Sequence, residues 1–287
     1  MLRLVVAFEA EARPLLDRFR MEPACEGPFK VFQGDGVWLI VSGQGKAAAA
    51  AATAYLHLFA GAAMGCAWLN VGVGGHARRP VGESFIAHKI TDPASGASWY
   101  PQLVIDAPRP TAPLLTVERV EEEYSPPWIY ESEAAGFFPT ACRFSLAELV
   151  HCFKVISDNP DTTLSRRTSS AVVEKLIEQS LEEIVAFGQD LADLAREVAE
   201  VSADPSFYQE IVERWPFTAG QQRRLRRLLQ RLAVLDPESS RSGAVLSGAT
   251  EGRDVLRLLE IRLSEIPIRL PAPGEAVLQL STSKKRS

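Results

Sequence analysis

The sequence predicts an α/β protein, a three-layer α/β/α sandwich followed by a mainly helical C-terminal extension. From residue 1 to about 200, short runs rich in β-branched residues alternate with helical segments, which favours a mostly parallel sheet covered by helices. A composition of 46% hydrophobic and 23% charged residues is typical of globular proteins. We therefore expect a domain over 1–200 and a helical appendage over 201–287 that ends in a flexible tail.

The elements of the first 200 residues follow from the period of their apolar residues and from the turns between them. Gly34-Asp35-Gly36 interrupts the apolar run 31–42 and indicates a hairpin of two strands. Further strands or β-rich runs are expected at 2–8, 66–71, 83–90, 114–120 and 151–157. Helices are expected over 9–19, over the alanine-rich 45–59, from about 133 onward, and over about 169–200.

The appendage carries its own helical signals. Thr218 and Gln221 have the spacing of a capping box, and a leucine stripe follows them on one helix face. The stripe consists of Leu225, Leu228, Leu229 and Leu232. The same helix holds Arg223, Arg224, Arg226, Arg227 and Arg231. Two interpretations stay open for these arginines, a solvated basic face or a docking surface for an acidic partner or nucleic acid, although the acidic charge of the whole chain counts against nucleic acid.

Charge, cysteine usage and hydropathy exclude several classes of protein. A net charge of −5 does not favour a nucleic acid or membrane partner. The segment 47–69 is mostly alanine and glycine and breaks at Gly61 and Gly65, so we expect a helix and a strand rather than a membrane span. The N-terminal residues fit a first strand better than a signal peptide. The cysteines are Cys25, Cys66, Cys142 and Cys152, scattered as in a reduced, cytoplasmic protein.

Acidic residues follow or precede several predicted strands. In open α/β sheets ligands bind at the carboxyl ends of the strands, so Glu11, Glu133 and Asp158 could converge on one crevice. Each also has a structural explanation, because acids stabilise helix starts and Asp occurs in turns. The glycine motifs at 43–46 and 72–77 do not complete a nucleotide-binding loop. The four histidines occur singly, so we expect no metal and no cofactor.

Five short motifs, in order, resemble the purine nucleoside phosphorylase/uridine phosphorylase superfamily, and within it the methylthioadenosine/S-adenosylhomocysteine nucleosidases. They are VVAFEAEARPLL, VSGQGKAAAA, LNVGVGGHARRPVGE, YESEAAGFF and VISDNPD. The resemblance covers roughly residues 1 to 195. It implies a nucleoside phosphorylase-type fold for the first domain, a homodimer, and a small-molecule nucleoside substrate.

The resemblance also assigns roles to matching positions. Glu133 would bind the ribose 2′- and 3′-hydroxyls, Asp158 would act as the general acid at purine N7, and Glu11 would activate the attacking water. The remaining motif positions expected at the substrate site are Ser132, Ser157 and Gly74. Glu131 occupies a less critical acidic position of the motif.

The resemblance favours hydrolysis of the N-glycosidic bond of a purine nucleoside, of 5′-modified adenosine type. Glu11 would repel phosphate, whereas Arg78 and Arg79 leave phosphorolysis as an alternative. A non-catalytic nucleoside-binding or scaffold protein is a further alternative. The stretch between Gly75 and Glu131 is short for the family, so the residues that stack on the base and the 5′ pocket are not assigned.

Overall fold

A computed structural model of the 287-residue chain describes residues 1–266 apart from 26, 119–123, 163–168, 203, 206, 237 and 240–243. It divides into two compact units, Met1–Ala199 and Glu200–Ser287. The predicted tail lies outside the described residues.

A ten-stranded mixed sheet forms the centre of the first unit. Its strands are β1 (Leu2–Val6), β2 (Glu22–Cys25), β3 (Lys30–Gly34), β4 (Val37–Val41), β5 (Ala67–His76), β6 (Ser84–Asp92), β7 (Ala97–Trp99), β8 (Thr111–Thr116), β9 (Ile129–Glu131) and β10 (Val150–Asp158). The central strands β4, β1, β5 and β10 are parallel, as predicted, whereas antiparallel pairs lie toward both flanks of the sheet. β8 is also parallel to β6 and β9, so the sheet is parallel in its centre and in part of the β6–β9 region, and mixed elsewhere.

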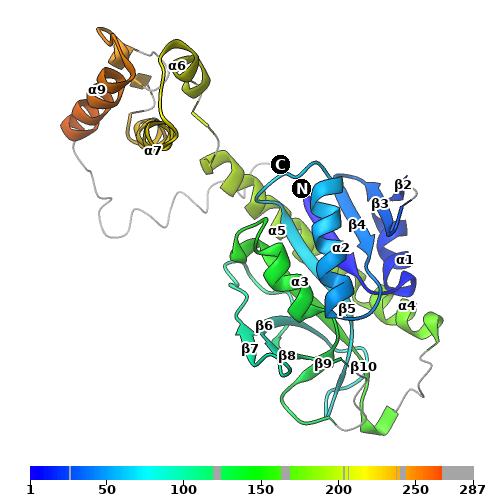
Figure 1. Cartoon of the computed structure of the whole chain (residues 1–287). Helices are drawn as coiled ribbons and strands as arrows, with labels where there is room; N and C mark the ends of the chain where they lie inside the picture. The colour runs from blue at the N-terminus through cyan, green and yellow to red at the C-terminus, as the bar shows by residue number, and fades with distance from the viewer. Residues whose placement is uncertain are drawn as a thin grey trace, which may run out of the picture. The chain divides into compact units, whose positions relative to one another are not determined.

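Five strands close on themselves at one end of the sheet. The order β10-β6-β8-β9-β5 returns to its start because β5 also pairs with β10, so these strands form a small barrel (Figure 1). β5 continues as a strand through the glycine segment to His76, several residues beyond the predicted end. The small β2, β7 and β9, of three or four residues, were not predicted.

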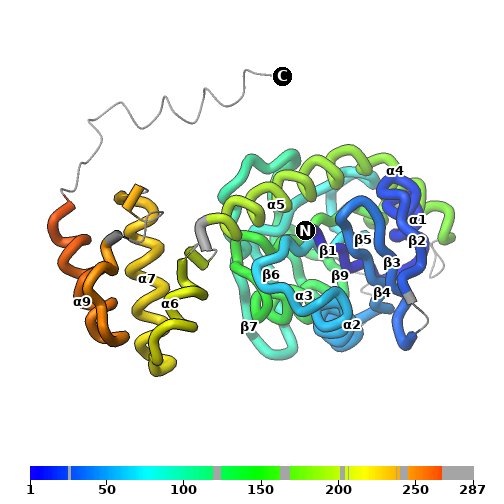
Figure 2. Tube along the Cα trace, turned by 90° about the horizontal axis from the view of Figure 1, so that it is seen from above, coloured from blue at the N-terminus to red at the C-terminus, as the bar shows by residue number. Residues whose placement is uncertain are grey.

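Two helical layers cover the sheet, as the view from above shows (Figure 2). One layer consists of α1 (Glu9–Arg18), α4 (Ser170–Gln179) and α5 (Leu181–Ser202). The other consists of α2 (Lys46–Phe59) and α3 (Ala134–Ala141). Each layer packs against its own apolar cluster on one face of the sheet, so the predicted three-layer sandwich is confirmed.

Two features of the helices depend on packing. The predicted single helix over about 169–200 is two helices that meet at the buried Ser180, and both contribute to the same core. In α3, a Cβ atom on Gly136 would lie 1.8 Å from the carbonyl oxygen of Lys46 in α2. Only glycine therefore allows α2 and α3 to approach this closely.

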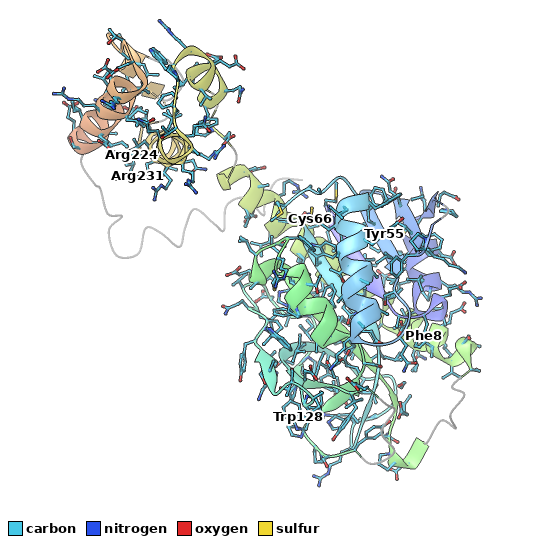
Figure 3. The ribbon with its side chains drawn as sticks, viewed as in Figure 1. Phe8, Tyr55, Cys66, Trp128, Arg224 and Arg231 are labelled. Atoms are coloured by element: carbon cyan, nitrogen blue, oxygen red, sulfur yellow. The ribbon has the colours of Figure 1, made fainter. Side chains whose placement is uncertain are left out.

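The second unit contains α6 (Tyr208–Arg214), α7 (Ala219–Leu235) and α9 (Gly252–Glu265) around an apolar core of its own. The Thr218–Gln221 capping box and the predicted leucine stripe of α7 are confirmed. Arg224 pairs with Glu260 at 2.5 Å and Arg226 pairs with Asp204; Arg224 and Arg231 are labelled in Figure 3. Docking of a protein partner on this helix stays a prediction. Within the described part of the chain, we find no helix with the length and apolar character needed to cross a membrane.

Candidate active site

One crevice at the carboxyl ends of the central strands brings all the predicted site residues together. Its volume is about 130 Å³. The predicted residues in its lining are Glu11, Gly74, Ser132, Glu133, Ser157 and Asp158. Other lining residues include Phe8, which follows β1 (labelled in Figure 3), Tyr124 and Tyr130. Residues far apart in the sequence therefore meet at one edge of the sheet.

Glu11 is a buried acceptor and not a solvated residue of the first helical turn. Its Oε2 accepts hydrogen bonds from the backbone N–H groups of Ala7 at 2.8 Å and Phe8 at 2.9 Å, and Oε1 accepts from Val73 at 3.2 Å. Its side chain thereby caps α1 and ties it to β5. Glu9, in the same turn, is exposed and pairs with Lys30 instead.

The two acids that precede α3 have different surroundings. Glu131 accepts from the backbone N–H groups of Glu133 at 3.0 Å and Ala134 at 2.8 Å, and from the Thr116 hydroxyl at 2.5 Å. It therefore holds the start of the helix. Glu133 accepts from the backbone N–H of Gly45 at 3.1 Å and lines the crevice. Its Oε1 is fixed from the α2 side, and the carboxylate remains at the crevice wall.

Lys154, in the middle of β10, is the main residue that sequence reasoning missed. Its Nζ lies 3.1 Å from Glu131 Oε2 and 3.8 Å from Glu133 Oε2, and its side chain is 1% exposed. A Cβ on Gly72 would lie 3.0 Å from Glu11 Oε1 and 3.2 Å from Lys154 Nζ, so this glycine gives both groups their space. A lysine flanked by the apolar residues Phe153 and Val155 in this strand was the signal available in the sequence.

Asp158 lies at the end of β10, where a register shift between Ile156 and Asp158 turns the chain. The Ser157 hydroxyl donates to Asp158 Oδ1 at 2.6 Å. The phenol of Tyr124 donates to Oδ2, and its ring lies where a Cβ on Gly75 would be. Tyr124 therefore occupies the space next to the predicted general acid. No pattern in the sequence pointed to Tyr124.

The position of Gly74 is explained by the packing of the sheet more directly than by contact with a ligand. A Cβ at this position would lie 2.7 Å from Ile129 Cγ2 and 2.8 Å from the Tyr130 carbonyl oxygen, both in β9. Glycine is therefore required for β5 and β9 to pack. Arg78 and Arg79, the predicted alternative phosphate ligands, do not line the crevice but a separate cavity.

Burial governs the protonation of the buried acids. Burial and the neighbouring Glu133 charge raise the pKa of Glu11 to about 7, although the charge of Lys154 opposes this rise. Burial also raises the pKa of Glu133. For Lys154, burial alone would lower the pKa of the ammonium group, but Glu131 and Glu133 raise it above its usual range. Lys154 therefore stays charged and partly balances three carboxyl groups.

Compared with protein-family models, curated protein sequences and solved structures, the chain matches only solved structures. Similar structures include a Helicobacter pylori MTAN mutant with 5′-methylthioadenosine in its active site, at 15% identity and a TM-score of 0.53, covering 66% of this chain and 98% of that one. The first unit has the nucleoside phosphorylase fold.

Two further structures with this fold are named for substrates that differ from each other. A Neisseria meningitidis 5′-methylthioadenosine/S-adenosylhomocysteine nucleosidase in complex with methylthio-immucillin-A has 19% identity and a TM-score of 0.50, covering 64% of this chain and 97% of that one. The futalosine hydrolase of Helicobacter pylori has 14% identity and a TM-score of 0.53, covering 66% and 97%. The predicted nucleoside phosphorylase-type fold is thus confirmed. Among the described residues, no group of three or more His, Cys, Asp or Glu side chains is arranged to hold a metal ion.

Proposed function

We propose that the first unit hydrolyses the N-glycosidic bond of a purine nucleoside, with a 5′-modified adenosine as the preferred substrate. The observation that carries this proposal is the convergence of Glu11, Glu133 and Asp158 on one crevice of the nucleoside phosphorylase fold. Similar structures that contain 5′-methylthioadenosine or methylthio-immucillin-A support the adenosine-type substrate.

Each carboxyl group has a separate task in this reaction. Glu133 accepts hydrogen bonds from the ribose hydroxyls with the oxygen atoms that face the crevice. As the C1′–N9 bond breaks, Asp158 donates a proton to N7, and the base leaves as a neutral molecule. A water molecule forms the new bond to C1′ and transfers a proton to Glu11. A pKa of about 7 suits Glu11 to accept this proton at neutral pH.

The surrounding charges favour water over phosphate as the nucleophile. The crevice lining contains four carboxyl groups, and no arginine, lysine or histidine is among its described residues. A phosphate ion would face these carboxylates without a cation to bind it. The same negative charges would stabilise an oxocarbenium-like sugar in the transition state.

A base-release assay tests this proposal. Adenosine, 5′-deoxyadenosine, methylthioadenosine and S-adenosylhomocysteine are each incubated with the full chain, with and without phosphate, and free adenine is measured. We expect adenine release that needs neither phosphate nor a metal, and that is lost in Asp158→Asn. A strict phosphate requirement would assign the protein to the phosphorylases.

A non-catalytic nucleoside-binding protein is the second candidate, favoured by the contact between Tyr124 and Asp158. Ligand sites commonly have about 300–1,000 Å³, so a crevice of about 130 Å³ does not hold a nucleoside unless Tyr124 moves. Tyr124→Phe removes the hydroxyl that holds the ring at Asp158. If this variant binds nucleosides more tightly yet releases no adenine, the binding function is supported over catalysis.

A further inference from the structure

A second, larger cavity of about 590 Å³ lies in the first unit and shares no lining residue with the carboxylate crevice. Its walls come from the end of β5 and the chain that follows it, from β6 and β8, and from Pro126 and Pro127. This volume is within the usual range for sites that bind small molecules. The proposed nucleosidase reaction does not use it.

The cavity has a cationic side. Arg78 and Arg79 both line it, as do His76 and His88, and none of its described lining residues is acidic. Arg79 is partly neutralised because its Nη1 lies 3.3 Å from Glu83 Oε1. The guanidinium group of Arg78 is exposed and has no ion pair or hydrogen bond among the described residues. Its charge is therefore available to an anion.

The backbone that carries the two arginines is held in place. The buried His76 ring accepts hydrogen bonds at Nδ1 from the backbone N–H groups of Arg78 at 2.9 Å and Arg79 at 3.0 Å. Asn159 donates to the Arg79 carbonyl oxygen at 2.9 Å. Burial lowers the pKa of His76, consistent with a neutral ring that accepts at Nδ1. A fixed backbone reduces the entropy lost when the arginines bind a ligand.

Other parts of the cavity wall are apolar. Pro113, Pro126 and Pro127 contribute to it, and the Arg79 guanidinium lies 5.1 Å from the centre of the buried Phe85 ring. Stacking on an aromatic ring orients a guanidinium group without using its hydrogen-bond donors. The cavity thus combines donors for an oxyanion with a surface for an apolar group.

From these contacts we propose that this cavity binds a small organic oxyanion, a phosphate ester or a carboxylate. Arg78 and Arg79 bind its anionic group, and its apolar body packs against Pro113, Pro126 and Pro127. An inorganic anion makes no contact with the apolar part of the cavity, and a neutral aromatic molecule leaves the charge of Arg78 unpaired.

Calorimetry on the full chain with four probes tests this inference. Phenyl phosphate and benzoate carry both features, inorganic phosphate carries only the anion, and benzyl alcohol carries only the apolar body. We expect phenyl phosphate or benzoate to bind at least several-fold more tightly than the two partial probes. The tighter of the two distinguishes a phosphate ester from a carboxylate.

Variants locate the binding. Arg78→Gln should weaken binding of the better probe about tenfold or more, since it removes charge-assisted hydrogen bonds. Arg143→Gln is the matched control, because Arg143 is also exposed and lines neither cavity. Equal losses in both variants, or unchanged affinity in Arg78→Gln, would overturn the inference. The inference would also be overturned if neither phenyl phosphate nor benzoate bound at concentrations up to about 10 mM, because even weak specific ligands bind with dissociation constants of about 1 mM. None of these readouts depends on adenine release, so the inference and the proposed function can fail separately.

Discussion

The ammonium group of Lys154 lies 3.8 Å from the carboxylate of Glu133, and both side chains are more than nine-tenths buried. Lys154 also pairs with Glu131, which holds the start of α3. A buried cation in β10 thus affects the charge of a crevice whose carboxyl groups come from β9, from the end of β10 and from the starts of α1 and α3.

Lys154→Met should destabilise the protein by about 3–5 kcal/mol, the usual cost of removing one partner from a buried ion pair. Glu131 and Glu133 would remain buried without a cation, and the pKa of Glu133 should rise further, since the Lys154 charge opposes its rise. Urea unfolding at pH 7 measures the loss. Lys30→Met, which breaks the exposed pair with Glu9, is the control and should have a much smaller effect. Similar losses in the two variants would contradict the role given to Lys154.

Stability should depend on pH through Glu11. The pKa of Glu11 is about 7 in the folded protein, against a usual value of 4.5. Between about pH 4.5 and pH 7, the folded state therefore keeps a proton on Glu11 that the unfolded state has lost. The stability from this residue is therefore complete below about pH 4.5 and falls as pH rises to about 7, by up to ~3 kcal/mol. In Glu11→Gln the decline should be smaller but not absent, because the pKa of Glu133 is raised as well. Unfolding free energies measured from pH 4.5 to 8 compare the two proteins, and parallel curves would refute the assignment.

Asp158 and Glu133 should affect different steps. Asp158→Asn should lower turnover roughly 10²–10⁴-fold and leave nucleoside affinity nearly unchanged, because the proton transfer matters as the bond breaks. Glu133→Gln should weaken both affinity and turnover, because the carboxylate contacts ribose before reaction. Calorimetry and adenine release separate the two effects. Glu9→Gln, an exposed acid beside the site, is the control and should match the wild type. Wild-type turnover in both site variants would refute the proposed roles.

The close approach of α3 to α2 gives a prediction about stability alone. Gly136→Ala should destabilise the first unit by about 1–3 kcal/mol or more, since its Cβ would overlap the rigid carbonyl group of Lys46. Gly220→Ala in α7 is the control, because a Cβ there meets nothing within 4 Å. That change should be neutral or slightly stabilising. Thermal unfolding of both variants measures the difference.

The sequence predicted those parts of the fold in which the pattern of apolar residues along a segment follows from how that segment is buried. Glu11 and Asp158 follow buried strands, and parallel strands place their carboxyl ends at one edge, so their convergence followed from the fold. Lys154 was missed because its partners come from β9 and α3, and no local pattern reveals a contact between distant segments. β9 itself has three residues, too few to show a period. The break at Ser180 was missed because the apolar pattern continues on both sides of it.

Closure of the barrel also affects how copies of the protein can associate. Because β5 and β10 pair with each other, β10 offers no free edge there for another strand. The edges that remain in the described sheet are β2, with four residues including Pro23, and β7, with three. Proline has no N–H to donate, and so short an edge offers few unpaired groups to another chain. The protein should therefore resist edge-to-edge aggregation at high concentration.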